Sequence, residues 1–328
     1  MRRREFIVGF GGAAAWSLKA GAQQPAMPVI GFVSVGALDE NYTRYLAAWR
    51  AGLAESGYIE DLNVSIEYHW LEGRYDRLAA LMTDLARRGV PVISLPGGSA
   101  SAVAAKAATS TIPIVFGVGD DPIKLGLVAS LARPGGNATG INYFSNEVVP
   151  RRLGLLSDLV PAAKRLAVLI NPRNGVGADF TLRDVQDAAR RLKWPIDVYK
   201  AGTRDEIEAA FDEMERDGAD ALFIAPDPYF NIRRYQLAAL ATHHEIAACY
   251  SDRDFVEAGG LMSYGTDVAG IWRQVGAYTG RILRGSNPAD MPVVQWDRFI
   301  FALNMKTAKA LDIKVLPITR ARADIVVE

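Results

Sequence analysis

A Gly-Gly-Ser turn between a predicted strand and a predicted helix is the feature of the sequence with the clearest binding chemistry. Gly97 and Gly98 follow an apolar run, and Ser99 and Ala100 open an alanine-rich helical stretch. The start of a helix presents unpaired backbone N–H groups and a positive dipole end, and glycines let the backbone approach a ligand closely. A ligand carboxylate could bind there, with the Ser99 hydroxyl as a further donor. Alternatively, Ser99 only caps the helix.

Polar and aromatic residues follow several other predicted strands. Ligands of open α/β sheets bind beyond the carboxyl ends of the strands, so these residues are expected to meet at one edge. Asp121 and Asp227 are suited to accept hydrogen bonds from a ligand ammonium or hydroxyl, although Asp before Pro is also common in turns. Tyrosines there would supply flat apolar walls. The predicted ligand-binding residues are Ser34, Gly98, Ser99, Ala100, Asp121, Tyr143, Asn171, Asp227, Tyr229 and Tyr250.

The sequence offers little for catalysis or for nucleic acid. It has three histidines and no H-E-x-x-H, G-x-S-x-G or Walker motif, so we expect no enzyme, no metal and no cofactor. The single cysteine, Cys249, lies in an apolar run and is predicted to be a small buried hydrophobe. Lys and Arg total 37, as do Asp and Glu, and no concentrated basic face for nucleic acid is evident.

The N-terminus has the order of a bacterial secretory signal. Arg2 to Arg4 are charged, an apolar stretch runs from Phe6 to Trp16, and Ala20-Gly21-Ala22 offers a small-residue cleavage site. The apolar stretch is shorter than the about 20 residues that span a bilayer. The run Arg3 to Ile7 resembles the twin-arginine export motif. We expect residues 1–22 to be removed after Ala22, and the mature protein to reach the periplasm.

The remaining chain alternates apolar strands with amphipathic helices, a rhythm typical of parallel sheets covered by helices. It occurs twice, on either side of about residue 145, which predicts an α/β fold of two doubly wound, Rossmann-like lobes. We assign residues 28–143 and 263–291 to the first lobe, and 144–262 and 292–328 to the second. A tail that crosses between lobes would form a multi-strand hinge, which allows closure around a ligand.

Three sequence blocks carry a family resemblance. The first runs from Ile112 to Gly140 and contains Ser-Leu-Ala-Arg-Pro-Gly-Gly-Asn at residues 130–137. The second runs from Phe255 to Gly265, and the third from Asn304 to Leu311, followed by Ala321-Arg322-Ala323-Asp324. Together they resemble the TrpX-like family of ABC transporter substrate-binding proteins, over the chain from about Val29 to the C-terminus.

The resemblance implies a type I periplasmic-binding-protein fold with a three-strand hinge. It also implies that a monomer captures a small solute and delivers it to an ABC permease and ATPase on other chains. Some relatives bind aromatic amino acids, so an aromatic amino acid or similar carboxylate is the expected ligand. Three alternatives stay open: an exported sensing subunit for a membrane receptor, the sensing domain of a transcription regulator, and a secreted α/β enzyme.

Overall fold

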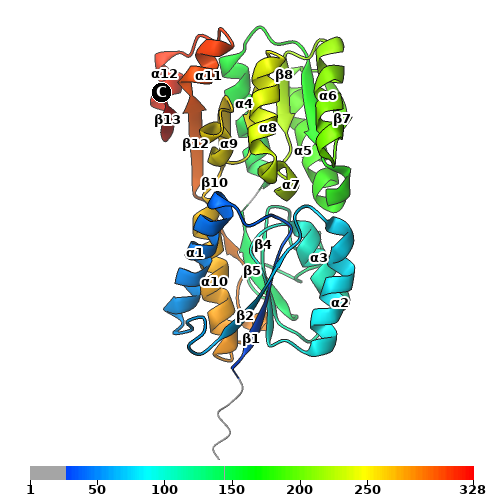
Figure 1. The fold of residues 1–328 in the computed structure, drawn as a ribbon, viewed down its shortest axis with the longest axis vertical. Coiled ribbons are helices and arrows are strands. Elements are labelled where there is room, and N and C mark those ends of the chain that lie inside the picture. Colours follow the sequence, from blue (N-terminus) through cyan, green and yellow to red (C-terminus); the bar gives the residue numbers. More distant parts are fainter. Residues whose placement is uncertain (1–26, 144) are drawn as a thin grey trace, which may run out of the picture.

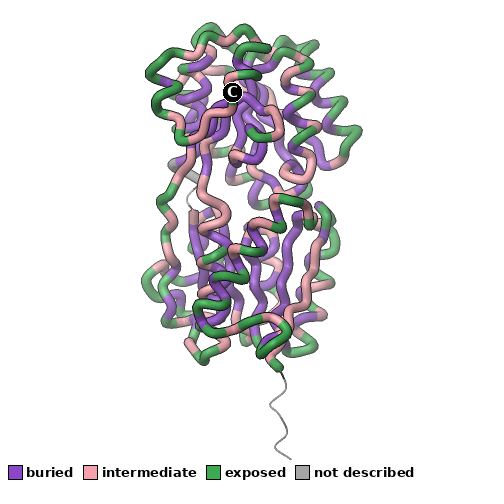
Figure 2. Tube along the Cα trace, turned by 60° about the vertical axis from the view of Figure 1, so that its left-hand side comes forward, coloured by how far each residue is buried: buried purple, intermediate pink, exposed green. Residues whose placement is uncertain are grey.

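Two parallel-sheet lobes lie end to end along the long axis of the molecule (Figure 1). The computed structural model describes residues 27–143 and 145–328, so the predicted signal and its cleavage site lie outside the described residues. Each lobe has a buried sheet under helices with exposed outer faces (Figure 2). The predicted α/β fold of two doubly wound lobes is confirmed.

The first lobe is a six-stranded parallel sheet in the order β11-β5-β4-β3-β1-β2. Alternate residues of β1 face opposite sides: Ile30 and Phe32 pack against α1 and α10, and Val33 packs against α2 and α3. The strands are β1 (Val29–Ser34), β2 (Ser65–Trp70), β3 (Val92–Leu95), β4 (Ile114–Val118), β5 (Ala138–Asn142) and β11 (Val294–Gln295); the helices are α1 (Glu40–Glu55), α2 (Leu78–Arg88), α3 (Ser99–Ala108) and α10 (Val268–Leu283), with short 3₁₀ turns η1 (Tyr75–Arg77) and η3 (Pro288–Asp290).

The second lobe is a seven-stranded sheet in the order β13-β12-β10-β9-β8-β6-β7, in which only the β10–β12 pair is antiparallel. Leu166 and Val168 of β6 pack under α4 and α5, whereas Ala167 and Leu169 face α6 and α8. The strands are β6 (Leu166–Ile170), β7 (Ile196–Lys200), β8 (Ala221–Ile224), β9 (Ala247–Tyr250), β10 (Met262–Thr266), β12 (Phe299–Asn304) and β13 (Ile325–Val327); the helices are α4 (Ser145–Leu159), α5 (Val176–Leu192), α6 (Arg204–Arg216), α7 (Pro228–Ile232), α8 (Arg234–His243), α9 (Arg253–Glu257), α11 (Met305–Ala310) and α12 (Pro317–Ala321), with η2 (Pro172–Asn174).

The chain crosses between the lobes three times, after β5, after β10 and between β11 and β12. Two predicted lobe boundaries are wrong. Residues 263–266 belong to β10, which pairs with β9 in the second sheet, not the first. Residues 294–295 form β11, which pairs with β5 in the first sheet, not the second. A strand of two residues carries no sequence period, so its pairing could not be predicted.

Glycines bring α1 and α10 into close contact on one face of the first lobe, where the two helices lie side by side (Figure 1). A Cβ at Gly52 would clash with the carbonyl oxygen of Arg273, and a Cβ at Gly276 would clash with that of Trp49. The contact matters for function because α1 and α10 both contribute walls to the cleft between the lobes.

We therefore expect Gly276→Ala to lower the free energy of unfolding by about 1–3 kcal/mol, the usual cost of overpacking. Gly154→Ala is the matched control, because a Cβ at Gly154 within α4 meets nothing within 4 Å. Gly154→Ala should stabilise the protein by about 0.5–1 kcal/mol, because alanine loses less backbone entropy than glycine when a helix forms. Urea unfolding measures both, and equal effects of the two substitutions would contradict the close contact.

Candidate ligand-binding site

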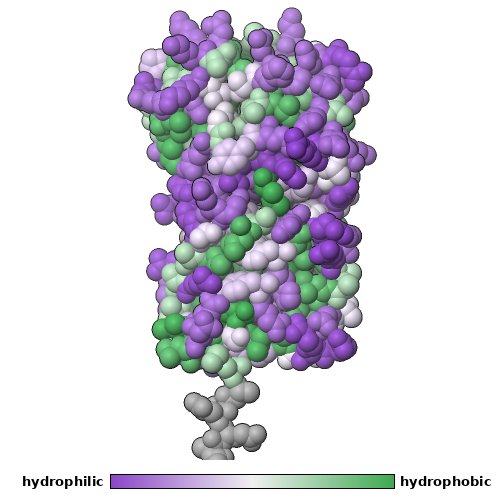
Figure 3. All heavy atoms as spheres, in the orientation of Figure 1, coloured by the Kyte–Doolittle hydropathy of each residue, from purple (hydrophilic) through white to green (hydrophobic). Residues whose placement is uncertain are grey.

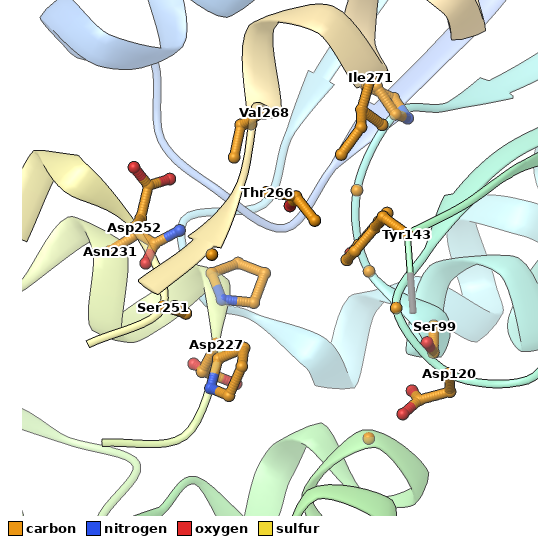
Figure 4. Close-up of a pocket in the computed structure, with 18 of the residues that line it drawn as sticks. Ser99, Asp120, Tyr143, Asp227, Asn231, Ser251, Asp252, Thr266, Val268 and Ile271 are labelled. Atoms are coloured by element: carbon orange, nitrogen blue, oxygen red, sulfur yellow. The ribbon is translucent and has the colours of Figure 1, made fainter. Parts of the chain in front are cut away.

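A cavity of about 160 Å³ lies between the two lobes. One buried water needs about 10–15 Å³, so the cavity has room for a molecule of on the order of ten non-hydrogen atoms. The end of β1, the loops after β3, β4 and β5 and the helices α1 and α10 wall it from the first lobe. The end of β10, the loops after β8 and β9 and the helices α4 and α5 wall it from the second. Ser99, Asp120 and Tyr143 lie on one side, and Asn231, Ser251 and Asp252 on the other (Figure 4).

The Gly-Gly-Ser turn lines the cavity as predicted, but it carries an acidic neighbour. Gly98 has a φ of 103°, a conformation that favours glycine. The Ser99 hydroxyl donates to the carboxylate of Asp120, which is only 6% exposed. Burial raises the pKa of Asp120 to about 6, and the bond from Ser99 partly offsets this. The first-lobe wall therefore combines backbone donors with a buried carboxyl group.

Asp227 is buried at the start of α7 and is held by four donors. Its Oδ1 accepts from the side-chain amide of Asn171 at 3.0 Å and from the backbone N–H groups of Tyr229 and Phe230; its Oδ2 accepts from the Tyr75 hydroxyl at 2.8 Å. Burial raises the pKa of Asp227, and these bonds oppose the rise. Because Tyr75 belongs to the first lobe, Asp227 also links the lobes.

A second cluster joins α1 to the loop after β9. The Tyr45 hydroxyl lies 2.6 Å from Asp254 Oδ2 and 3.2 Å from Asp252 Oδ2, and Arg44 Nη2 lies 2.5 Å from Asp254 Oδ1. Burial and the Asp254 carboxylate raise the pKa of Asp252. The hydroxyl has one proton to donate, so it can satisfy only one of the two carboxylates.

Arg234 of the second lobe pairs with Asp39 of the first, with Nη1 2.6 Å from Oδ2. Arg234 is 5% exposed. Together with the Tyr45 cluster and the Tyr75–Asp227 bond, this ion pair closes the two lobes against each other around the cavity.

Aromatic rings from α1 and α10 form one wall. Tyr42, Tyr45 and Trp272 line the cavity, and the centroids of both tyrosine rings lie 5.7 Å from that of Trp272. Trp70 stacks on Trp272 from behind, at 6.5 Å and 14°. Such a packed cluster offers a rigid apolar surface to a flat ligand.

Five of the ten predicted residues line the cavity: Ser34, Gly98, Ser99, Tyr143 and Asp227. Five do not. Ala100 lies one residue inside α3; Asp121 accepts from the backbone N–H of Ile123 in a turn; Asn171 supports Asp227; Tyr229 is buried and its hydroxyl accepts from Arg233; Tyr250 lies in the second-lobe core. In place of Asp121, it is Asp120 that faces the cavity.

Several cavity residues were missed by the sequence reasoning. Asp252 follows the end of β9 by two residues, and Asp227 follows the end of β8 by three, so both lie just beyond the carboxyl end of a strand. Tyr42 and Tyr45 are three residues apart on a helix, a spacing also typical of core residues. Arg152 and Trp272 lie within helices, where reading strand ends cannot find them.

The remaining chemistry is sparse in residues 27–143 and 145–328. No group of three His, Cys, Asp or Glu side chains there is placed to hold a metal ion. Cys249 is fully buried, as predicted, and burial raises the pKa of its thiol to about 12.

No helix within residues 27–143 and 145–328 has the length and apolar character needed to cross a bilayer. Hydrophilic residues cover most of the second-lobe face seen in Figure 3.

Residues 26–326 match the family model described as ABC transporter substrate binding protein. The chain belongs to this family. The resemblance found in the sequence is thereby confirmed, and the fold is that of type I periplasmic binding proteins, which LacI-type regulators share.

A curated relative is a tyrosine-binding protein of Clostridioides difficile strain R20291, 26% identical over 267 residues, which cover 80% of this chain and 75% of that protein. Two solved structures are each 22% identical, and each match covers 92% of this chain and 99% of the other. One is an ABC domain from Streptococcus pneumoniae in complex with L-Trp, with a TM-score of 0.81. The other is a ligand-free, open substrate-binding protein with adhesive properties from Clostridium difficile, with a TM-score of 0.62.

The raised pKa of Asp252 makes stability depend on pH. In the folded protein this carboxyl keeps its proton where the unfolded chain has lost it, so its contribution to stability falls as the pH rises above about 4. Asp252→Asn removes that penalty and can still cap α9. We expect the unfolding temperature of the variant to gain on the wild type between about pH 5 and about pH 8.

Thermal unfolding without ligand across that range measures the difference. Asp187→Asn, on an exposed position of α5, is the control and should run parallel to the wild type. An Asp252→Asn profile that also runs parallel would contradict the proposed burial of Asp252 between the lobes.

Proposed function

We propose that this protein captures an aromatic amino acid in the periplasm, closes around it, and delivers it to the permease and ATPase of an ABC importer. The role is binding, not catalysis. The observation that carries the proposal is the cavity between the lobes, where a packed aromatic wall faces buried carboxyl groups. That combination suits a ligand with a flat apolar ring at one end and an ammonium group at the other.

The aromatic wall accounts for the ring of such a ligand. Tyr42, Tyr45 and Trp272 are already packed by Phe32 and Trp70 behind them. A ring that stacks there buries apolar surface on both partners without ordering a flexible side chain. Aromatic pairs contribute about 0.5–1.5 kcal/mol beyond the burial itself.

The carboxyl groups account for the ammonium. Asp120, Asp227 and Asp252 all line the cavity, and burial raises the pKa of each. An ammonium group beside them would favour their charged forms and reverse part of that rise. The site is therefore electrostatically suited to a cationic group rather than to a neutral sugar.

The comparisons support the same ligand class. A relative that is named for tyrosine and a structure in complex with L-Trp both cover most of this chain. At equal identity and coverage, the chain matches the L-Trp complex with a TM-score of 0.81 and the open, ligand-free protein with 0.62. The lobes are thus arranged more like those of a liganded relative.

Closure is what makes capture useful to an importer. Ligand can shift the lobes toward the closed form only by binding that form more tightly than the open one. Here the cavity takes walls from both lobes, so a ligand makes its full set of contacts only after closure. The export signal predicted at residues 1–22 fits a protein that works outside the cytoplasm.

Isothermal titration against L-tyrosine, L-tryptophan, L-phenylalanine, aliphatic amino acids and a hexose tests this proposal. We expect heat and a raised unfolding temperature with one or more aromatic amino acids and neither with the hexose. Small-angle scattering should show no larger radius in the liganded protein. Binding of the hexose alone would overturn the assignment.

Filling the cavity should abolish binding without unfolding the protein. Gly97 lines the cavity, has no left-handed φ, and a Cβ added there meets nothing within 4 Å. Gly97→Leu should therefore fold normally and weaken aromatic amino acid binding by at least about 100-fold, because its side chain occupies the ligand volume. Gly97→Ala is the matched control and should lose far less. Wild-type affinity in the leucine variant would place the ligand elsewhere.

A further inference from the structure

Arg152 on α4 is a buried arginine at the wall of the cavity. It is 2% exposed and lines the cavity from the second lobe. Its Nε donates to the Tyr264 carbonyl oxygen at 2.9 Å, and its guanidinium carbon lies 5.1 Å from the centre of the Phe223 ring. The backbone carbonyl and the aromatic face hold the group in place without neutralising it.

The guanidinium has no carboxylate partner among the described residues. The other two buried or half-buried arginines at this interface are paired, Arg44 with Asp254 and Arg234 with Asp39. Among the described residues, Arg152 has no such ion pair, and its Nη1 has no hydrogen-bond partner. Burial lowers the pKa of Arg152 to about 10, and the nearby Asp252 carboxylate opposes the fall without forming an ion pair, so the group is still a cation at neutral pH.

An isolated buried charge is among the most unfavourable features that a folded protein can hold, and buried charges are normally paired. Here the missing partner is matched by an adjoining cavity with room for a small molecule. This arrangement is explained if the ligand itself carries the anionic group that pairs with Arg152.

We propose that Arg152 binds the carboxylate of the captured ligand, and so restricts the site to aromatic amino acids over the corresponding amines. The inference rests on the proposed function and names the ligand group that the second lobe recognises. Arginine presents paired N–H donors that match the geometry of a carboxylate. The ligand ammonium then faces the buried aspartates.

The Gly98–Ser99 turn, predicted to take the carboxylate, is less suitable. The Ser99 hydroxyl already donates to Asp120, and the Tyr143 hydroxyl accepts from the backbone N–H of Gly98. A ligand carboxylate placed there would also meet the Asp120 carboxyl group, and like charges repel. Arg152 offers the opposite charge and a free donor.

Titrations with L-tyrosine and tyramine test the proposal, because tyramine lacks only the carboxylate. The wild type should bind tyramine roughly 100-fold more weakly than L-tyrosine. Arg152→Met should bind L-tyrosine roughly 100-fold more weakly than the wild type and discriminate little between the two ligands. Arg152→Lys should recover part of the discrimination. Arg151→Met, at the exposed neighbouring position, is the control and should match the wild type.

The outcomes separate this inference from the function on which it rests. Wild-type protein that binds L-tyrosine and tyramine equally, or Arg152→Met that keeps the wild-type ratio, overturns the role of Arg152 and leaves amino acid capture standing. Failure of the wild type to bind L-tyrosine, L-tryptophan or L-phenylalanine overturns both.

Thermal unfolding without ligand supplies a second readout. Arg152→Met should unfold at a temperature no lower than that of Arg151→Met, because it removes a buried charge that forms no ion pair with the described residues. A large fall in the unfolding temperature, or failure to fold, would assign Arg152 to the fold and overturn its role as a ligand group.

Discussion

The structure depends on one constraint: charges buried between the two lobes must find partners there. Asp254 pairs with Arg44, Asp39 pairs with Arg234, and Asp227 accepts hydrogen bonds from donors of both lobes. Asp252 shares a single tyrosine proton with Asp254, and burial and the Asp254 carboxylate raise its pKa. These pairs join the two lobes in this structure, and the groups left unsatisfied define what a ligand must bring.

The fold satisfies this constraint because rigid helices and strand ends line the cavity between the lobes. The chain crosses three times between the lobes, and the proposed closure would pivot on these three segments without disturbing either sheet. On the first lobe, Gly52 and Gly276 let α1 and α10 pack closely, which fixes Tyr45 and Trp272 as one surface. On the second, α4 places Arg152 against Phe223. Binding groups on helices and strand ends keep their geometry better than groups on free loops.

Much of the fold was predictable, because its periodicity is local. The alternation of strands and helices in two lobes is as predicted, and the Gly-Gly-Ser turn lies at the cavity. The site was predictable only where it follows strand ends. Asp120 and Asp121 are adjacent in sequence, but only Asp120 lines the cavity. The turn that places it there has no recognisable sequence motif. The sequence does not distinguish Arg152 from the other arginines. Its role is suggested by the absence of an ion pair with the described residues, which depends on three-dimensional packing.

The most direct test of this account is a crystal structure of the protein grown with L-tyrosine. We expect density between the lobes, with the ring against Trp272, the ammonium toward the buried aspartates and the carboxylate within hydrogen-bond distance of the Arg152 guanidinium. A carboxylate held instead by the backbone at Gly98 and Ser99, or a cavity left without ligand at saturating L-tyrosine, would contradict it.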